Sequence, residues 1–115
     1  MEKSSMSDAN TASYQVKNIE LVMAGSDVRA RLFTLAPRDV IPWHYHREAA
    51  DHYFILQGEL TISTRLPEET QTVRVGRHYR IAPGRPHLMA NRSTADCRFL
   101  LLQAVGTVDW VKADD

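Results

Sequence analysis

The sequence predicts an all-β protein, a single barrel or sandwich with negligible helix, on three observations. From Tyr14 onward, short runs rich in β-branched and aromatic residues alternate with turn signals made of Gly, Pro and Asp. No stretch of about 12 residues without Gly and Pro carries apolar side chains at helical spacing. The length of 115 residues allows one core and is too short for two. Closing the sheet would also remove edges that so short a domain covers poorly.

The expected strands lie between successive turn signals along the chain. Their ranges are 14–24, 28–36, 40–43, 51–58, 59–66, 72–75, 78–82 and 97–105. The first two flank the turn signal Gly25-Ser26-Asp27. Pro42 suits the start or the edge of the third strand. The fourth and fifth meet at Gly58-Glu59, as the two arms of a tight hairpin would.

Two segments fall outside this strand pattern. Only Arg47–Asp51 looks locally helical, and it is long enough for one turn. Residues 1–13 are rich in Ser, Asp and Asn and have almost no large apolar side chains, so we expect a mobile tail. The barrel domain is then expected to cover residues 14–112.

Charge and cysteine content narrow the classes of function. Fourteen basic residues balance fourteen acidic ones, so no long-range field recruits nucleic acid or an anionic membrane. No segment has the roughly 20 apolar residues of a membrane helix, and the first residues lack the apolar centre of a signal peptide. Cys97 is the single cysteine and lies in an apolar run. We therefore expect a buried, inert thiol and a cytoplasmic setting.

His44 and His46 are the first indication of a metal site. At positions i and i+2 of a strand, their rings point to the same face. Two imidazoles there repel when protonated and are costly to bury as cations, whereas neutral imidazole is a good metal ligand. Taken alone, the pair fits two surface histidines on an exposed strand at least as well, so the surrounding spacing decides.

That spacing has two parts. From His44 the chain reads H-Y-H-R-E-A-A-D-H-Y-F-I-L-Q-G, and from Gly76 it reads G-R-H-Y-R-I-A-P-G-R-P-H-L-M-A-N. These segments, in this order and 17 residues apart, resemble the two motifs of the cupin superfamily. The resemblance spans Arg38 to Asn91, about half the chain. It implies a small single-domain cupin, whose barrel is a double-stranded β-helix, or jelly roll.

The resemblance also implies a metal centre. It makes His44, His46 and His87 ligands of one divalent transition metal ion, with Fe, Mn, Ni, Zn and Cu all compatible with histidine ligands. It further implies that Gly58, Gly76 and Gly84 are turn glycines and that Asn91 closes the second motif.

Three positions depart from the two motifs. Arg38 stands where the first motif begins with Gly, and Ala82 stands where the second has Pro. Asp51 stands in place of the glutamate ligand, with a side chain about 1.5 Å shorter, whereas metal–oxygen bonds have little slack. Asp51 therefore either ligates the metal or hydrogen-bonds a ligand histidine. His52 points to the opposite face of a regular strand and would replace Asp51 only through a bulge.

Strand parity with Asp51 predicts the pocket wall. Tyr53 and Gln57 share its face and are the candidates for substrate contact. An apolar lining that includes Ile55, Ile81 and Met89 suits a small organic ligand. The further wall candidates are Arg80, Trp43 and Tyr45. Because the last two alternate with the ligand histidines, we expect them to face away.

These expectations favour an enzyme. Three histidines, with or without a carboxylate, leave metal positions open, as in catalytic sites. The resemblance favours a metal-dependent, dioxygenase-like enzyme acting on a small organic molecule, with isomerase, decarboxylase and lyase as other classes. The alternative is a non-catalytic binding or regulatory cupin, because no second catalytic acid, base or nucleophile is evident. A homodimer is also expected, paired through Tyr14–Leu21 or the C-terminal strand.

Overall fold

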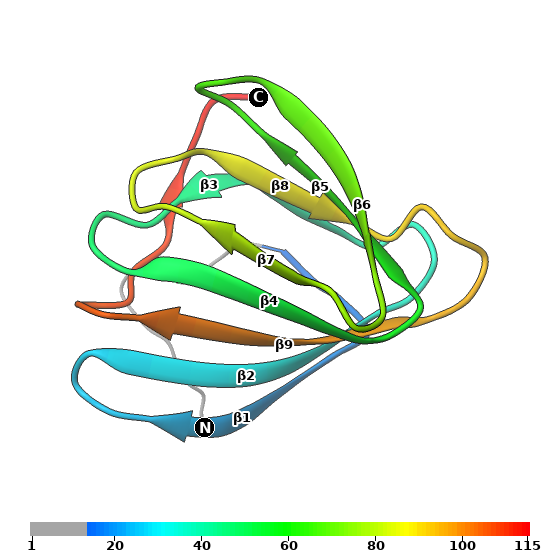
Figure 1. Ribbon diagram of the computed structural model, residues 1–115, viewed down its shortest axis with the longest axis horizontal. Helices are drawn as coiled ribbons and strands as arrows, with labels where there is room; N and C mark the ends of the chain where they lie inside the picture. Colours follow the sequence, from blue (N-terminus) through cyan, green and yellow to red (C-terminus); the bar gives the residue numbers. More distant parts are fainter. Residues whose placement is uncertain (1–13) are drawn as a thin grey trace.

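The computed structural model describes residues 14–115 and contains ten strands (Figure 1). They are β1 (Asn18–Ala24), β2 (Val28–Leu35), β3 (Val40–Tyr45), β4 (Ala50–Gln57), β5 (Glu59–Thr64), β6 (Glu69–Arg74), β7 (His78–Ile81), β8 (His87–Ala90), β9 (Cys97–Ala104) and β10 (Val111–Lys112). One antiparallel sheet has the order β1-β2-β9-β4-β7, and the other has the order β10-β3-β8-β5-β6. The chain passes back and forth between the two sheets, which confirms the predicted all-β jelly roll.

Helix is absent from residues 14–115. The helical turn expected at Arg47–Asp51 is wrong, because the chain bends at Arg47 and Glu48 and β4 begins at Ala50. Ala50 and Asp51 instead pair with β9, and one isolated turn has too few hydrogen bonds to compete with that pairing. The described residues accordingly include no helix that is long and apolar enough to cross a membrane.

The chain changes sheets at Gly58, so the hairpin expected at Gly58-Glu59 is wrong. β4 pairs with β7 and β9, whereas β5 pairs with β6 and β8. Gly58 has a φ of 75°, and a Cβ at this position would lie 2.6 Å from the carbonyl oxygen of Asp96. The glycine therefore makes a sharp corner between the sheets, a task that leaves the same signature in the sequence as a hairpin turn. The turn expected at Gly25-Ser26-Asp27 is confirmed, and β1 and β2 pair antiparallel on either side of it.

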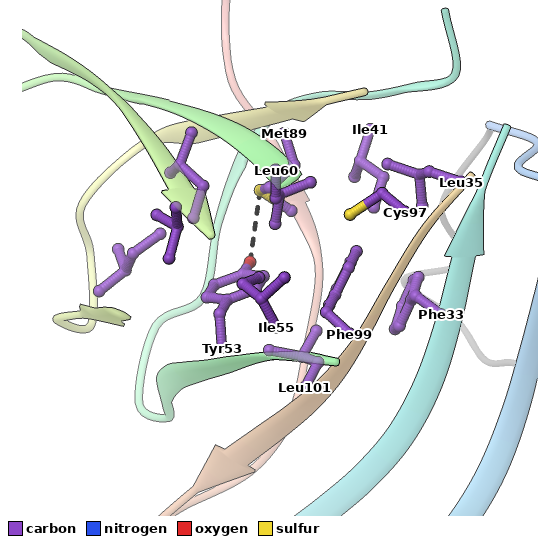
Figure 2. Close-up of a cluster of buried hydrophobic side chains, with 13 residues drawn as sticks. Phe33, Leu35, Ile41, Tyr53, Ile55, Leu60, Met89, Cys97, Phe99 and Leu101 are labelled. Carbon is purple, nitrogen blue, oxygen red and sulfur yellow. Dashed lines mark hydrogen bonds between the residues drawn. The ribbon is translucent and has the colours of Figure 1, made fainter. Parts of the chain in front are cut away.

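Alternate residues of the strands fill the space between the sheets. At one end the interior is apolar, and Figure 2 shows this cluster, in which Phe33 and Phe99 stack with ring centroids 5.0 Å apart. Cys97 is buried there, as predicted. Along β9 the inward row then passes through Leu101 to Gln103, and the inward row of β4 also becomes polar toward that end. The polar end of the barrel interior is where the candidate site lies.

Two motif positions outside the ligand set have structural roles. Arg38 has a φ of 78°, so the position where the motif begins with Gly does require a left-handed backbone in this chain. The fully buried amide of Asn91 donates to the carbonyls of Leu35 and Ala95, both at 2.8 Å. Asn91 thereby ties the end of β8 to the end of β2 and to the loop before β9.

Candidate metal centre

Three histidines and one aspartate meet inside the polar end of the barrel. His44 lies in β3, His46 follows the end of β3, Asp51 lies in β4 and His87 begins β8. One potential ligand atom from each of the four lies within 4.8 Å of the other three. The side chains are buried, with at most 3% of each residue exposed. Because β4 belongs to one sheet and β3 and β8 to the other, closing the barrel assembles the centre.

Backbone carbonyl oxygens fix the tautomer of all three histidines. The Nδ1–H groups donate to carbonyls as follows: His44 to Pro42 at 2.7 Å, His87 to Arg85 at 2.8 Å, and His46 to Asp109. A neutral imidazole has one N–H and one lone pair. With Nδ1 protonated, each histidine therefore offers the lone pair of Nε2 to the centre, which is the arrangement that holds ligand rings in place at metal sites.

Asp51 reaches these histidines despite its short side chain. Its Oδ2 lies 3.0 Å from Nε2 of His87 and 3.3 Å from Nε2 of His46. The Tyr53 hydroxyl donates to Oδ2 at 2.8 Å, and the Gln103 amide donates to Oδ1 at 3.0 Å. Burial alone would raise the pKa of Asp51, but the two adjacent histidines hold it well below its usual value. The centre therefore contains an ionised, oriented carboxylate.

The imidazoles of His44 and His46 differ in how readily they accept a proton. Burial, together with the neighbouring His87 and His46, lowers the pKa of His44 well below its usual value. Burial also lowers the pKa of His46, but the Asp51 carboxylate outweighs it and the net shift is upward. Metal ligation requires neutral imidazole. His44 is therefore neutral at pH 7, and a metal must displace the proton that Asp51 favours on His46.

Gln103 orients the Asp51 carboxylate. The sequence did not predict Gln103 as a site residue. It lies directly opposite Asp51 in the β4–β9 register and is 1% exposed. Its Oε1 accepts hydrogen bonds from Arg29 at 3.1 and 3.3 Å and from Arg31 at 3.4 Å. The amide is thus oriented, with oxygen toward the two arginines and NH2 toward Asp51. The signal that could have found it is an uncharged polar residue inside the apolar run 99–105.

A C-terminal strap, residues 107–114, closes the site from the side of β3. It leaves the end of β9 and runs to the other sheet (Figure 1), where Lys112 of β10 pairs with His44. The Asp109 carbonyl in this strap receives the Nδ1–H of His46. The Trp110 ring stacks on the His44 ring, with centroids 4.9 Å apart and planes 15° from parallel. No local pattern marks these residues, since Asp109 and His46 are 63 positions apart.

Of the two predicted substrate contacts, Tyr53 lies inside the barrel and Gln57 does not. The Tyr53 hydroxyl contacts Asp51 and also lies 3.3 Å from Sδ of Met89 (Figure 2). Gln57 is exposed at the far end of β4, six residues beyond Asp51, or about 20 Å along a strand. A bulge between Ile55 and Gln57 breaks the alternation from which its inward direction was predicted.

The other candidates lie outside the centre. Nδ1 of His52 lies 3.1 Å from Nε2 of His78, with the two rings stacked on the outer face of β4 and β7. Arg80 is exposed and pairs with His52 in the register. Trp43 lies under the guanidinium of Arg65, 3.8 Å from its ring centroid. This places Trp43 away from the histidines, as expected from its alternation with them.

The donor set fits a divalent transition metal ion. Histidine nitrogens with a single carboxylate oxygen suit Fe, Mn, Ni, Zn and Cu alike. Four protein ligands leave positions open on an ion that prefers five or six, as catalytic sites require. When bound, a redox-active ion supplies one-electron chemistry with dioxygen, and a redox-inert ion supplies Lewis acidity. Asp51, oriented by Tyr53 and Gln103, would set the charge and the geometry on one side of that ion.

Comparison with known proteins places this geometry in context. Residues 31–103 match the family model described as the cupin domain. No curated protein gives a significant sequence match. An uncharacterized Klebsiella pneumoniae protein with a double-stranded β-helix domain superposes with a TM-score of 0.74, at 19% identity over 83% of this chain and 82% of that chain. The protein TT1209 from Thermus thermophilus has a TM-score of 0.69 at 23% identity, over 82% of this chain and 90% of that chain.

Oxalate oxidase in complex with the substrate analogue glycolate is a third similar structure. Its TM-score is 0.71 at 17% identity, over 90% of this chain and 59% of that longer chain. At such identities the likeness concerns the fold. The family match, in contrast, covers more than half of the chain and both histidine motifs. On this match, with the shared fold in support, the chain belongs to the cupin family.

Proposed function

We propose that this cupin is a metal-dependent enzyme, dioxygenase-like in its chemistry, that acts on a small organic molecule inside the barrel. His44, His46 and His87 would hold the metal through Nε2, and Asp51 would complete the ligand set. The open metal positions would receive the substrate and the second reactant. Tyr53 and Gln103 would act on the reaction by fixing the direction of the Asp51 carboxylate.

The observation that carries this proposal is the common direction of the three histidines. Each Nδ1–H is fixed by a backbone carbonyl, and one potential ligand atom of each histidine lies within 4.8 Å of the others and of a carboxylate oxygen of Asp51. Burial and the neighbouring histidines lower the pKa of His44 and so keep it in the neutral form that binds a metal. One divalent ion satisfies all four side chains at once.

Metal analysis followed by oxygen consumption tests the proposal. The purified protein should contain about one transition metal ion per chain, and His87→Ala should lose it. The Fe- or Mn-loaded protein should then consume dioxygen with at least one member of a panel of chelating organic acids, diketones and catechols. A protein without metal after reconstitution would contradict the proposal.

A non-catalytic binding role is the second candidate, and one observation favours it. Among the described residues, the buried carboxylates are Asp51 and Asp109. The Asp109 side chain is bonded to the backbone and guanidinium of Arg47, outside the ligand set. No other buried carboxylic acid among residues 14–115 is available to move a proton to a substrate. A ligand recovered unchanged after long incubation with the metal-loaded protein would support this role.

We also propose a homodimer that pairs through β1. This strand is an edge of its sheet, and all seven of its residues are exposed. Leu21, Val22 and Met23 are 65%, 53% and 59% exposed, which is unusual for adjacent apolar residues on an open strand edge. Antiparallel pairing of β1 with a second copy would be self-complementary. Light scattering should give twice the chain mass of 13.1 kDa, and Leu21→Lys should give a single-chain mass.

The setting of the protein is proposed to be cytoplasmic. The one cysteine, Cys97, is a buried thiol without a disulfide partner, which suits a reducing compartment. Fractionation of cells that express the natural gene would test this.

A further inference from the structure

The backbone carbonyl that accepts the Nδ1–H of His46 belongs to Asp109, in a segment that is not part of any strand. Residues 107–110 of the C-terminal strap lie between the end of β9 and the start of β10. Within a strand, pairing with a neighbour fixes the direction of each carbonyl. In an irregular segment other contacts must fix it. The direction of the acceptor for His46 therefore depends on what holds Asp109 itself.

The Asp109 side chain is held by Arg47, the residue that follows His46. Oδ1 of Asp109 accepts a hydrogen bond from the backbone N–H of Arg47 at 3.1 Å, and Oδ2 accepts one from Nη1 of Arg47 at 3.3 Å. His46 in turn donates its Nδ1–H to the Asp109 carbonyl. Asp109 thus contacts two consecutive residues, one through its side chain and the other through its main chain. These contacts close a ring of bonds that includes the His46 side chain.

Of the two contacts with Arg47, the one to the backbone N–H is expected to matter more. The side chain of Arg47 is 63% exposed, whereas that of Asp109 is 7% exposed. An ion pair with an exposed guanidinium contributes about 0–1 kcal/mol, because water screens it and a long side chain must be ordered. The backbone N–H is already fixed by the chain, and its bond to a carboxylate is charge-assisted. The carboxylate is therefore tied to the main chain directly beside a potential metal ligand.

The same segment also contacts His44. Trp110 follows Asp109, and its ring stacks on the His44 ring with centroids 4.9 Å apart. The strap has a second anchor two residues before Asp109, where the N–H of Thr107 donates to Oε1 of Glu48 at 2.9 Å. A displacement of Asp109 would therefore affect His46 directly and His44 through the neighbouring ring.

We propose that Asp109 is a positioning residue of the metal centre. Its carboxylate, held by the N–H of Arg47, aims its own carbonyl at Nδ1 of His46 and thereby directs Nε2 of His46 toward the metal. Asp109 is not one of the four potential ligands, so it acts on the metal only through His46. The inference rests on the proposed function in one respect, since it requires a metal in the four-residue centre.

Two measurements on the full chain test this inference: Zn(II) affinity, in competition with a chromophoric chelator, and the visible spectrum of the Co(II)-loaded protein. Asp109→Ala and Asp109→Leu both remove the acceptor for the N–H of Arg47. Each should weaken Zn(II) binding about tenfold, the lower end of the range for outer partners of metal ligands, and should change the Co(II) bands. Asp109→Asn keeps an acceptor oxygen and should restore the wild-type spectrum. Arg47→Ala keeps the backbone N–H and should change Zn(II) affinity less than about threefold.

Asp39→Ala is the matched control for a general loss of stability. Oδ2 of Asp39 also accepts backbone N–H groups, from Lys17 and from Ala36, at 2.8 Å each. Asp39 precedes β3 and is five residues, or about 16 Å along a strand, from His44. Asp39→Ala should lower the melting temperature of the metal-free protein and leave the Zn(II) affinity and the Co(II) spectrum unchanged.

The outcomes separate this inference from the proposed function. Wild-type Zn(II) affinity and Co(II) spectrum in Asp109→Ala and Asp109→Leu would overturn the inference and leave the metal centre standing. Failure of Asp109→Asn to restore the spectrum, or an equal loss of Zn(II) affinity in Asp39→Ala, would do the same. Failure of wild type to retain either metal would overturn the proposed function as well.

Discussion

Replacement of Gln103 by leucine tests the metal centre most sharply without changing any of its four potential ligands. The change keeps the size of a 1% exposed side chain and removes its amide. Oδ1 of Asp51 then loses a donor at 3.0 Å, and the arginines of β2 lose their shared acceptor. Asp51 would keep the Tyr53 hydroxyl on Oδ2 but lose the donor that orients Oδ1, so its carboxylate would be held less firmly toward Nε2 of His46 and His87.

The expected magnitude follows from the hydrogen bonds that the leucine cannot make. Removing an outer partner of a metal ligand typically lowers metal affinity about 10- to 100-fold. Leaving a buried acceptor without its donor costs about 1–3 kcal/mol. We therefore expect Gln103→Leu to bind Zn(II) about 10- to 100-fold more weakly than wild type, in competition with a chromophoric chelator, and to unfold at a lower urea concentration.

Gln57→Leu is the matched control, because it makes the same change at an exposed position on the far end of β4. It should have wild-type affinity for Zn(II). If Gln103→Leu binds Zn(II) as tightly as wild type, the role assigned to the amide is refuted. If Gln57→Leu weakens binding instead, the placement of the site at the opposite end of the strand is refuted.

Three further predictions concern the backbone, the thiol and the strap. Arg38 has a φ of 78°, which costs a residue with a side chain about 1–2 kcal/mol. Arg38→Gly should therefore melt several degrees above Arg38→Ala, which removes the side chain but keeps the strain, and equal melting temperatures would contradict this. Burial raises the pKa of the Cys97 thiol from 9.0 to about 12, so less thiolate forms at pH 8 in the native than in the unfolded protein, and Ellman's reagent should label the native protein far more slowly. Equal labelling rates would show an accessible thiol. Truncation after Gly106 removes the acceptor for His46 and the ring on His44, and should weaken Zn(II) binding at least tenfold; unchanged affinity would show that the strap does not position the ligands.

The sequence predicted the parts of the site that depend on short-range spacing. His44 and His46 are two residues apart, and the parity of a strand is enough to direct both rings to one side. His87 required the resemblance, since nothing near His44 indicates which distant histidine joins it. The sequence does not decide the role of Asp51. Its side chain is one methylene shorter than that of glutamate, and the sequence does not show whether the backbone makes up the difference. In the structure β4 lies close enough for Oδ2 of Asp51 to reach 3.0 Å from Nε2 of His87.

The features that were not predicted depend on contacts between distant segments. Gly58 carries the local signature of a turn, and only the pairing of β4 with β9 and of β5 with β8 makes it a corner between sheets. Gln57 follows the parity of Asp51 until the bulge, which no neighbouring residue announces. Trp110 acts on the site through a strap that pairs with β3. Strand alternation therefore determines which face a residue occupies, whereas closure of the barrel determines what it meets there.

An anomalous difference map from crystals of the metal-loaded protein tests the central claim most directly. The account predicts one peak per chain, about 2.0–2.3 Å from Nε2 of His44, His46 and His87 and in contact with the carboxylate of Asp51. The Nδ1 atoms should still face their backbone carbonyls. No peak at this position, or a peak between His52 and His78 on the outer face in its place, would contradict the account.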